Sequence, residues 1–149
     1  MSEAEQFRKR MSGKLPDVGV LRLNRDHKKF LEHLIKFHEL VERLSRKSPT
    51  ENEWIDVKSE INFLGGYASA HFKDEEELML MHGFPGTVEH TKEHNDFLKR
   101  FGEYQNRLIS DHDIIYVVDL KFFLLEWFYH HVNLVDVKYG VFFKSIGIK

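Results

Sequence analysis

Seven residues of types that bind metal ions recur along this chain at spacings typical of helices: His27, His71, Glu75, His90, His94, His131 and Asp136. Two pairs, His71 with Glu75 and His90 with His94, are four residues apart, so each pair lies on one face of an α-helix. A single pair of this kind is common on helix surfaces and does not by itself indicate a metal site, whereas several matched pairs do. The sequence has no cysteine. Imidazole nitrogens and carboxylate oxygens without thiolates favour iron, manganese or zinc.

Four amphipathic helices are predicted to position these residues. Apolar side chains recur every three or four residues over 23–44, 54–79, 88–108 and 117–128. Asn24, Thr87 and Asp113 are the expected N-caps of the first, third and fourth helices. Thr50 and Glu53 have the form of a capping box at the start of the second helix. Short turns between the helices predict an all-α fold, an antiparallel up-down-up-down four-helix bundle.

The order of the helices brings the candidate ligands to one end of this bundle. In an antiparallel arrangement, the start of the first helix and the end of the second share one end with the start of the third and the end of the fourth. His27 lies near the start of the first helix and His131 near the end of the fourth. The pair His71 and Glu75 lies near the end of the second helix, and the pair His90 and His94 lies near the start of the third. All seven side chains are therefore expected at one level of the core.

The spacing of His131 and Asp136 does not fit a regular α-helix. Five residues turn such a helix by about 500°, so the two side chains diverge by roughly 140°. Either the helix ends between them or it contains a wider turn, which often marks a functional site. The sequence therefore predicts a distortion at Asn133–Asp136.

Length, composition and charge restrict the class of protein. The chain has 149 residues, enough for one domain, and a net charge of −2, which gives no basic excess for binding nucleic acid. No apolar run is long enough to cross a membrane, and the first twenty residues are too polar for a signal peptide. We expect a cytoplasmic protein with an N-terminal arm (1–18) and a bundle (19–149). A monomer is favoured over a weak oligomer.

Seven ligands are too many for one ion and predict two. Five imidazoles, two bridging carboxylates and one bridging solvent oxygen fill eleven of the twelve positions around two octahedral ions. One position, on one ion, is left for a small ligand. His38 and His82 face the core roughly 16 Å further along the axis, and we interpret them as core or boundary residues. His33, His112 and His130 are interpreted as surface residues or outer neighbours of the site.

The chain resembles the hemerythrin family, in particular the single-domain bacteriohemerythrins, over roughly residues 18–143. The resemblance rests on four segments: Asp26-His27-Lys28, His71-Phe72-Lys73-Asp74-Glu75, His90-x-x-x-His94-x-x-Phe97 and Trp127-x-x-x-His131-Val132-x-x-x-Asp136-x-x-Tyr139. It implies two non-haem irons per chain, bridged by Glu75, Asp136 and an oxo or hydroxo group. It further implies that one iron is coordinatively full and binds three histidines, which by position are His90, His94 and His131. The other iron has the open position and binds two histidines, His27 and His71.

The resemblance also implies a pocket for the small ligand. Four residues fall where the family lines it: Phe72, Phe97, Trp127 and Tyr139. Phe128 stands where the family often has leucine, and its larger ring is expected to narrow the pocket. The tryptophan usual before the first helix is missing, and Asn24 and Asp26 replace the family's common Asp and Gln before the first ligand.

The implied function is reversible dioxygen binding for transport, storage or delivery, without catalysis. One alternative is a module that senses oxygen or nitric oxide through a partner protein. Another is a diiron enzyme, such as an oxidase, a peroxidase or an enzyme that handles nitric oxide. The Glu-x-x-His motif of ferritin-like oxidases does not occur in this sequence, which ranks turnover chemistry low.

Overall fold

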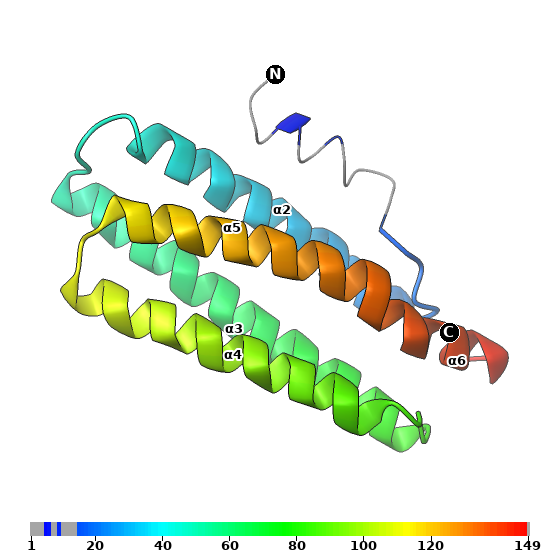
Figure 1. Cartoon of the computed structure of the whole chain (residues 1–149). Helices are drawn as coiled ribbons and strands as arrows, with labels where there is room; N and C mark the ends of the chain where they lie inside the picture. The colour runs from blue at the N-terminus through cyan, green and yellow to red at the C-terminus, as the bar shows by residue number, and fades with distance from the viewer. Residues whose placement is uncertain (1–4, 7–8, 10–14, 149) are drawn as a thin grey trace.

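The protein is a bundle of four long antiparallel helices (Figure 1). A computed structural model describes residues 5–6, 9 and 15–148. Its elements follow in this order: α2 (Leu21–Leu44), α3 (Glu51–Met81), α4 (Thr87–Ser110), α5 (Ile114–His130), the π-helix η1 (His131–Asp136) and α6 (Val137–Ser145). The described residues contain no strand. The predicted all-α four-helix bundle is confirmed.

Each long helix packs against two others, and the fourth is extended by two further elements. α3 packs against α2 and α4, and α5 packs against the same two helices. η1 and α6 follow α5 without a break, so the end of the chain continues past the bundle core (Figure 1). No helix in the described residues has both the length and the apolar character that a membrane span requires.

Two of the four predicted helix caps are confirmed. Thr50 and Glu53 form a reciprocal capping box at the start of α3, and Asp113 accepts a hydrogen bond from the backbone N–H of Ile115. Asn24 is not the cap of α2, which begins three residues earlier after Val20. The Asn24 Oδ1 instead accepts a hydrogen bond from the backbone N–H of Val18 at 3.0 Å.

Thr87 is likewise not a cap, because it is the first residue of α4 and Gly86 precedes it. Its hydroxyl donates a hydrogen bond to the backbone carbonyl of Phe84 at 2.6 Å, so it is engaged by the preceding turn. In both wrong predictions the polar side chain forms a hydrogen bond with a neighbouring backbone segment instead of capping the helix.

Two apolar clusters lie on either side of the level at which the candidate ligands gather. On α3, Phe72 belongs to the larger cluster and Leu78 to the smaller, and Glu75 lies between them. Along η1 and α6, Val132 belongs to the larger cluster and Tyr139 to the smaller, with Asp136 between. The candidate site is therefore a polar layer enclosed by apolar packing.

The N-terminal segment closes the smaller cluster. Val18 is fully buried there beside Tyr139 and Phe143. Residues 1–4, 7–8 and 10–14 of the predicted arm lie outside the described residues, and the division at residue 18 stays a prediction. Gly140 on α6 allows this docking, because a Cβ there would lie 2.9 Å from the Cα of Val18.

We predict opposite effects of alanine at two helical glycines. Gly140→Ala forces Val18 away and is expected to lower the free energy of unfolding by about 1–3 kcal/mol. Gly66→Ala adds a Cβ into open space on α3, and it is expected to raise that free energy by about 0.5–1 kcal/mol. Urea denaturation followed by circular dichroism measures both. Equal effects of the two substitutions would contradict the docking of Val18 against Gly140.

Candidate metal centre

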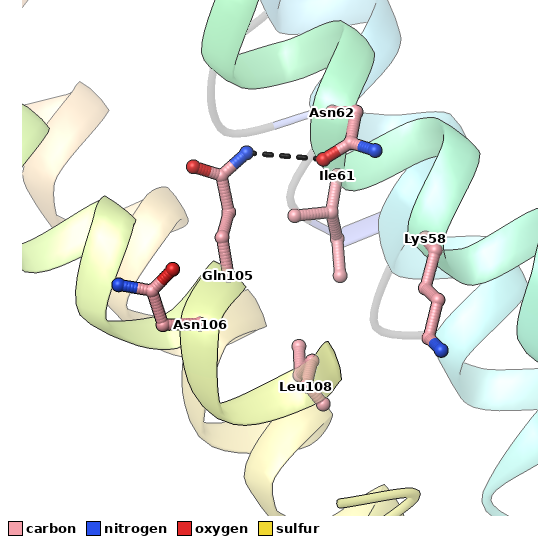
Figure 2. Close-up of a pocket in the computed structure, with 6 residues that line it drawn as sticks. All are labelled: Lys58, Ile61, Asn62, Gln105, Asn106 and Leu108. Carbon is pink, nitrogen blue, oxygen red and sulfur yellow. Dashed lines mark hydrogen bonds between the residues drawn. The ribbon is translucent and has the colours of Figure 1, made fainter. Parts of the chain in front are cut away.

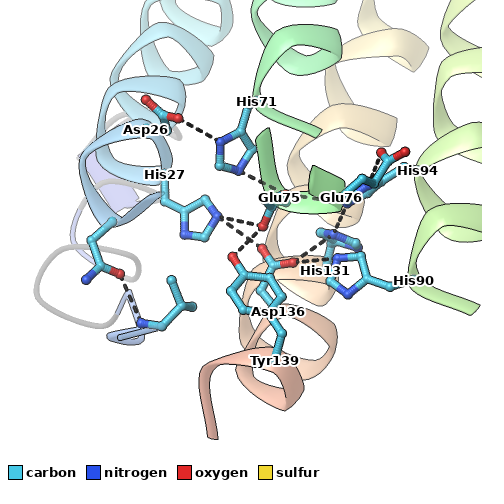
Figure 3. A network of polar contacts seen from close by, with 12 residues as sticks. Asp26, His27, His71, Glu75, Glu76, His90, His94, His131, Asp136 and Tyr139 are labelled. Carbon is cyan, nitrogen blue, oxygen red and sulfur yellow. Dashed lines mark hydrogen bonds and ion pairs between the residues drawn. The ribbon is translucent and has the colours of Figure 1, made fainter. Parts of the chain in front are cut away.

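All seven predicted ligands are buried and lie together at one end of the bundle (Figure 3). Their side chains form two overlapping groups, and within each group one ligand atom per residue lies within 4.8 Å of all the others. The larger group contains Glu75, His90, His94, His131 and Asp136. The smaller contains His27, His71 and Glu75. The convergence expected from helix order is present in the structure.

The π-helix η1 is what turns Asp136 toward His131. A π-helix closes i→i+5 hydrogen bonds, so residues five apart lie nearly above one another. Asp136 Oδ1 lies 2.9 Å from His131 Nε2, although the two residues would point apart on a regular α-helix. The distortion predicted at Asn133–Asp136 is confirmed, and it extends back to His131.

Asp136 presents its two carboxylate oxygens to opposite sides of the site. Its Oδ2 lies 3.1 Å from His27 Nε2, whereas its Oδ1 lies 3.0 Å from His90 Nε2. Glu75 is similarly central, with Oε1 at 3.1 Å from His71 Nε2 and 3.5 Å from His94 Nε2. Each carboxylate therefore contacts imidazoles of both groups, which is the geometry of a bridge between two ions.

Several inward-facing atoms have no hydrogen-bond partner of acceptable geometry in the described structure. They are fully buried: the Nε2 atoms of His27, His71 and His90, Glu75 Oε1 and both oxygens of Asp136. In addition, His94 Nε2 and His131 Nε2 face each other at 3.0 Å. Buried polar atoms left unpaired are costly. A nitrogen-and-oxygen donor set converging in this way fits divalent cations, which would satisfy all of these atoms at once.

Three outer carboxylates hold the imidazoles by their other ring nitrogen. Asp26 Oδ2 lies 2.9 Å from His71 Nδ1, Glu76 Oε2 lies 2.9 Å from His94 Nδ1, and Glu93 Oε1 lies 2.9 Å from His131 Nδ1.

Such contacts fix the tautomer and the ring orientation, so that Nε2 points into the site. Sequence reasoning did not assign these roles. The available signal was that Asp26, Glu76 and Glu93 each adjoin a predicted ligand in the sequence.

The site carries strongly perturbed acid–base groups. Burial opposes protonation of His71, yet the charge of Glu75 and hydrogen bonds to carboxylates raise the pKa of His71 to about 10. The same competition, with Asp136 as the main charge, raises the pKa of His131 to about 9. Burial lowers the pKa of His94 to about 3, so this ring is neutral. Burial and the neighbouring negative charge of Glu75 raise the pKa of Glu76.

Tyr139 completes the layer from the side of the smaller apolar cluster. It is fully buried, and its hydroxyl donates a short hydrogen bond to Glu75 Oε2 (Figure 3). Burial raises the pKa of Tyr139 well above its usual value, so the hydroxyl remains a donor at neutral pH. Its position holds one oxygen of Glu75 in place.

A small cavity of about 20 Å³ adjoins the site on the side of the larger apolar cluster. Its wall combines polar residues of the site, His27, His71, His131 and Asp136, with six apolar residues: Phe30, Ala68, Phe72, Trp127, Phe128 and Val132. This volume accommodates about one water-sized molecule. Three of the five predicted pocket residues, Phe72, Trp127 and Phe128, thus line it.

The other two predicted pocket residues lie elsewhere. Phe97 packs behind the wall, with its ring centroid 4.2 Å from that of Trp127. Tyr139 lies on the far side of Glu75 from the larger cluster. Phe128 contacts Phe30 at a centroid distance of 5.5 Å, so two rings close this side of the cavity.

The remaining histidines do not join the site. His38 is buried and its Nε2 lies 2.9 Å from Glu42 Oε1, and His82 is half-buried against Phe143. The other three are half-buried or exposed: His33, His112 and His130. These placements agree with the interpretation made from spacing.

A larger hollow of about 300 Å³ lies between α3 and α4, at the other end of the bundle (Figure 2). Its polar wall consists of Lys58, Asn62, Gln105 and Asn106, and Gln105 Nε2 donates a hydrogen bond to Asn62 Oδ1 at 3.1 Å. Asn62 precedes Glu75 by about 20 Å along the helix axis. The lining residues include no carboxylate or imidazole, so this hollow is not the metal centre.

Comparison with known proteins gives one family. A model described as "Hemerythrin HHE cation binding domain" matches residues 18–139. A bacteriohemerythrin of Stenotrophomonas maltophilia is 29% identical over 124 residues, which cover 83% of this chain and 74% of that protein. A bacteriohemerythrin of Clostridium acetobutylicum is 23% identical over 83% of this chain and 92% of its own length. A hemerythrin of Themiste dyscrita is 27% identical over 56% of this chain and 63% of its own length.

The raised pKa values predict how the metal-free protein responds to pH. The folded-state pKa values of His71 and His131 exceed the unfolded value of about 6.5, so their stabilising effect is complete below that pH. It is lost as the pH rises through about 9 to 10. The free energy of unfolding is expected to fall by several kcal/mol between pH 7 and pH 10. Urea denaturation of metal-free protein at a series of pH values measures this, and a flat profile would contradict it.

Proposed function

Because this chain belongs to the hemerythrin family, whose domains bind a diiron centre, we propose that it binds dioxygen reversibly and serves in its transport, storage or delivery. The proposal rests above all on one observation. A cavity the size of a single small molecule, with six apolar residues in its wall, adjoins the buried cluster, and both histidines of the group with fewer protein donors line it.

The seven converging residues are the proposed iron ligands, with Glu75 and Asp136 as bridges. His90, His94 and His131 would hold one iron, and His27 and His71 the other. This assignment is supported by the two groups of donors and by the way each carboxylate contacts both. The pair of irons supplies the electron exchange that makes uptake of dioxygen reversible.

The open position is proposed to lie on the iron of His27 and His71. Both imidazoles line the cavity, whereas His90 and His94 do not contribute to its wall. The wall offers a diatomic ligand aromatic and aliphatic surface, and Phe30 with Phe128 keeps the volume small. A pocket of this size excludes larger substrates.

The chain's own residues favour binding over turnover. The cavity wall includes no acid or base other than the proposed ligands. Tyr139 is committed to Glu75, and its raised pKa keeps the phenolic proton in place. Proton delivery to a substrate, which an oxidase or peroxidase requires, therefore has no evident donor beside the cavity among the described residues. We accordingly propose that the protein is not an enzyme.

Sensing through a partner remains the alternative function, and nitric oxide the alternative ligand. A sensor would need a surface that changes when a ligand enters the cavity. The residues that line this cavity lie on α2, α3, α5 and η1, and the apolar ones belong to or pack against the larger apolar cluster. The burial of this wall within the bundle supports storage or delivery.

Exposure of anaerobic ferrous protein to air tests the proposed function. We expect two irons per chain by metal analysis, and new charge-transfer absorption in the near-ultraviolet and visible that disappears when oxygen is removed. Irreversible oxidation without such a cycle would refute reversible binding. Steady-state consumption of peroxide or nitric oxide would refute the non-enzymatic assignment.

Deletion of Asn133 tests the assignment of Asp136 as a ligand. Removing one residue from η1 is expected to restore a regular α-helix and to turn the residue equivalent to Asp136 by about 100°. The variant should remain helical by circular dichroism and bind fewer than two irons per chain. The matched substitution Asn133→Ala keeps the register and should bind two, because the Asn133 side chain donates a hydrogen bond to the Tyr129 backbone carbonyl at 2.9 Å and is not one of the proposed ligands. Two irons in both variants would contradict the bridge.

A further inference from the structure

We propose that the two metal positions fill in sequence, and that Asp26, Glu76 and Glu93 are the positioning residues that set the order. The position of His90, His94 and His131 fills first, and that of His27 and His71 fills second. This inference rests on the ligand assignment proposed above. It adds a function for three carboxylates outside that ligand set and a defined one-metal state of the protein.

The three carboxylates are arranged in the same way around the bundle, and Figure 3 shows two of them, Asp26 and Glu76. Each lies on one helix beside a proposed ligand of that helix and reaches a ligand of the next element. Asp26 of α2 reaches His71 of α3, and Glu76 of α3 reaches His94 of α4. Glu93 of α4 reaches His131 at the start of η1. All three contacts are 2.9 Å long and are directed to Nδ1.

The arrangement is not completed at His27. Its Nδ1 is buried and has no hydrogen-bond partner among the described residues. His27 nevertheless contacts Asp136 and Glu75 through Nε2, at 3.1 Å and 3.6 Å. Its ring is therefore held only from the side of the metal centre, whereas His71, His94 and His131 are held from both sides.

The carboxylates that orient the imidazoles are therefore distributed unequally between the two metal positions. The first position has two imidazoles oriented by carboxylates, His94 and His131, and a third, His90, without such a contact in the described structure, within a group of five donors. The second has one oriented imidazole, His71, and the unanchored His27, within a group of three. An orienting carboxylate typically changes metal affinity by about 10–100-fold. The first position is accordingly the tighter one.

Titration of the metal-free full-length chain with Co²⁺ under anaerobic conditions tests the order. Isothermal calorimetry gives the affinities, and the visible absorption of bound Co²⁺ distinguishes the two environments. We expect two steps of one equivalent each, with dissociation constants that differ by about tenfold or more. Two equivalents bound in a single step of uniform affinity would overturn the order.

Two substitutions are expected to act in opposite directions. Asp26→Asn weakens the hold on His71 alone, so it should widen the gap between the two steps and change only the Co²⁺ spectrum of the second. Glu93→Gln weakens the hold on His131 alone, so it should narrow the gap and change the spectrum of the first. A purely structural role would shift both steps together. That result, or an exchange of the two effects, would overturn the assignment of the positioning residues.

Glu89→Gln is the matched control. Glu89 adjoins His90 in the sequence as Glu93 adjoins His94, but it is exposed, and its removal should leave both steps unchanged. The proposed function fails by a different result, namely iron-loaded protein that binds no dioxygen. Sequential loading with Co²⁺ does not depend on that outcome, so the two failures are distinguishable.

Discussion

Two carboxylates buried in an apolar core are the constraint on which the arrangement of this bundle depends. Glu75 and Asp136 are 0% and 1% exposed, and apolar clusters lie on both sides of them. An uncompensated buried charge costs several kcal/mol, so positive charge must converge on these two residues from every side. Imidazoles converge on them from α2, α3, α4 and η1, and the raised pKa values of His71 and His131 favour their protonated form in the absence of metal. Divalent cations would compensate the carboxylates more completely than protonated histidines can. The helix order, the π-helix and the outer carboxylates all serve this convergence.

Much of the site could be predicted because its parts depend on helical geometry alone. The i, i+4 pairs on α3 and α4 fix which faces carry ligands, and antiparallel order fixes the level at which they meet. Even the irregular element was predictable, since the five-residue spacing of His131 and Asp136 fits no regular α-helix. The caps were only half predictable. Thr50 and Asp113 use contacts within three residues, whereas Asn24 binds the N-terminal segment and Thr87 binds the preceding turn.

The outer carboxylates could not be assigned from the sequence, because their partners lie on other helices. Glu76 stands in an acidic run that is typical of a solvated helix face, yet its Oε2 lies 2.9 Å from His94 of α4. Which of several neighbouring acids crosses to the next helix depends on the rotation and separation of the helices, and a single sequence does not specify either. Glu89 and Glu93 illustrate the point, since both precede a histidine and only Glu93 reaches across to His131.

The asymmetry between the two halves of the site links binding to structure. The group of His90, His94 and His131 is enclosed by orienting carboxylates and aromatic rings, with Phe72 stacked on His94 at a centroid distance of 3.9 Å. Both His27 and His71 line the cavity, whereas of the three histidines of the first group only His131 does. A ligand position can remain open only where protein donors are few and the adjoining space is too apolar for water to bind well. The scarcity of donors on this side of the site is the common reason why we propose both the open ligand position and the weaker second metal position there.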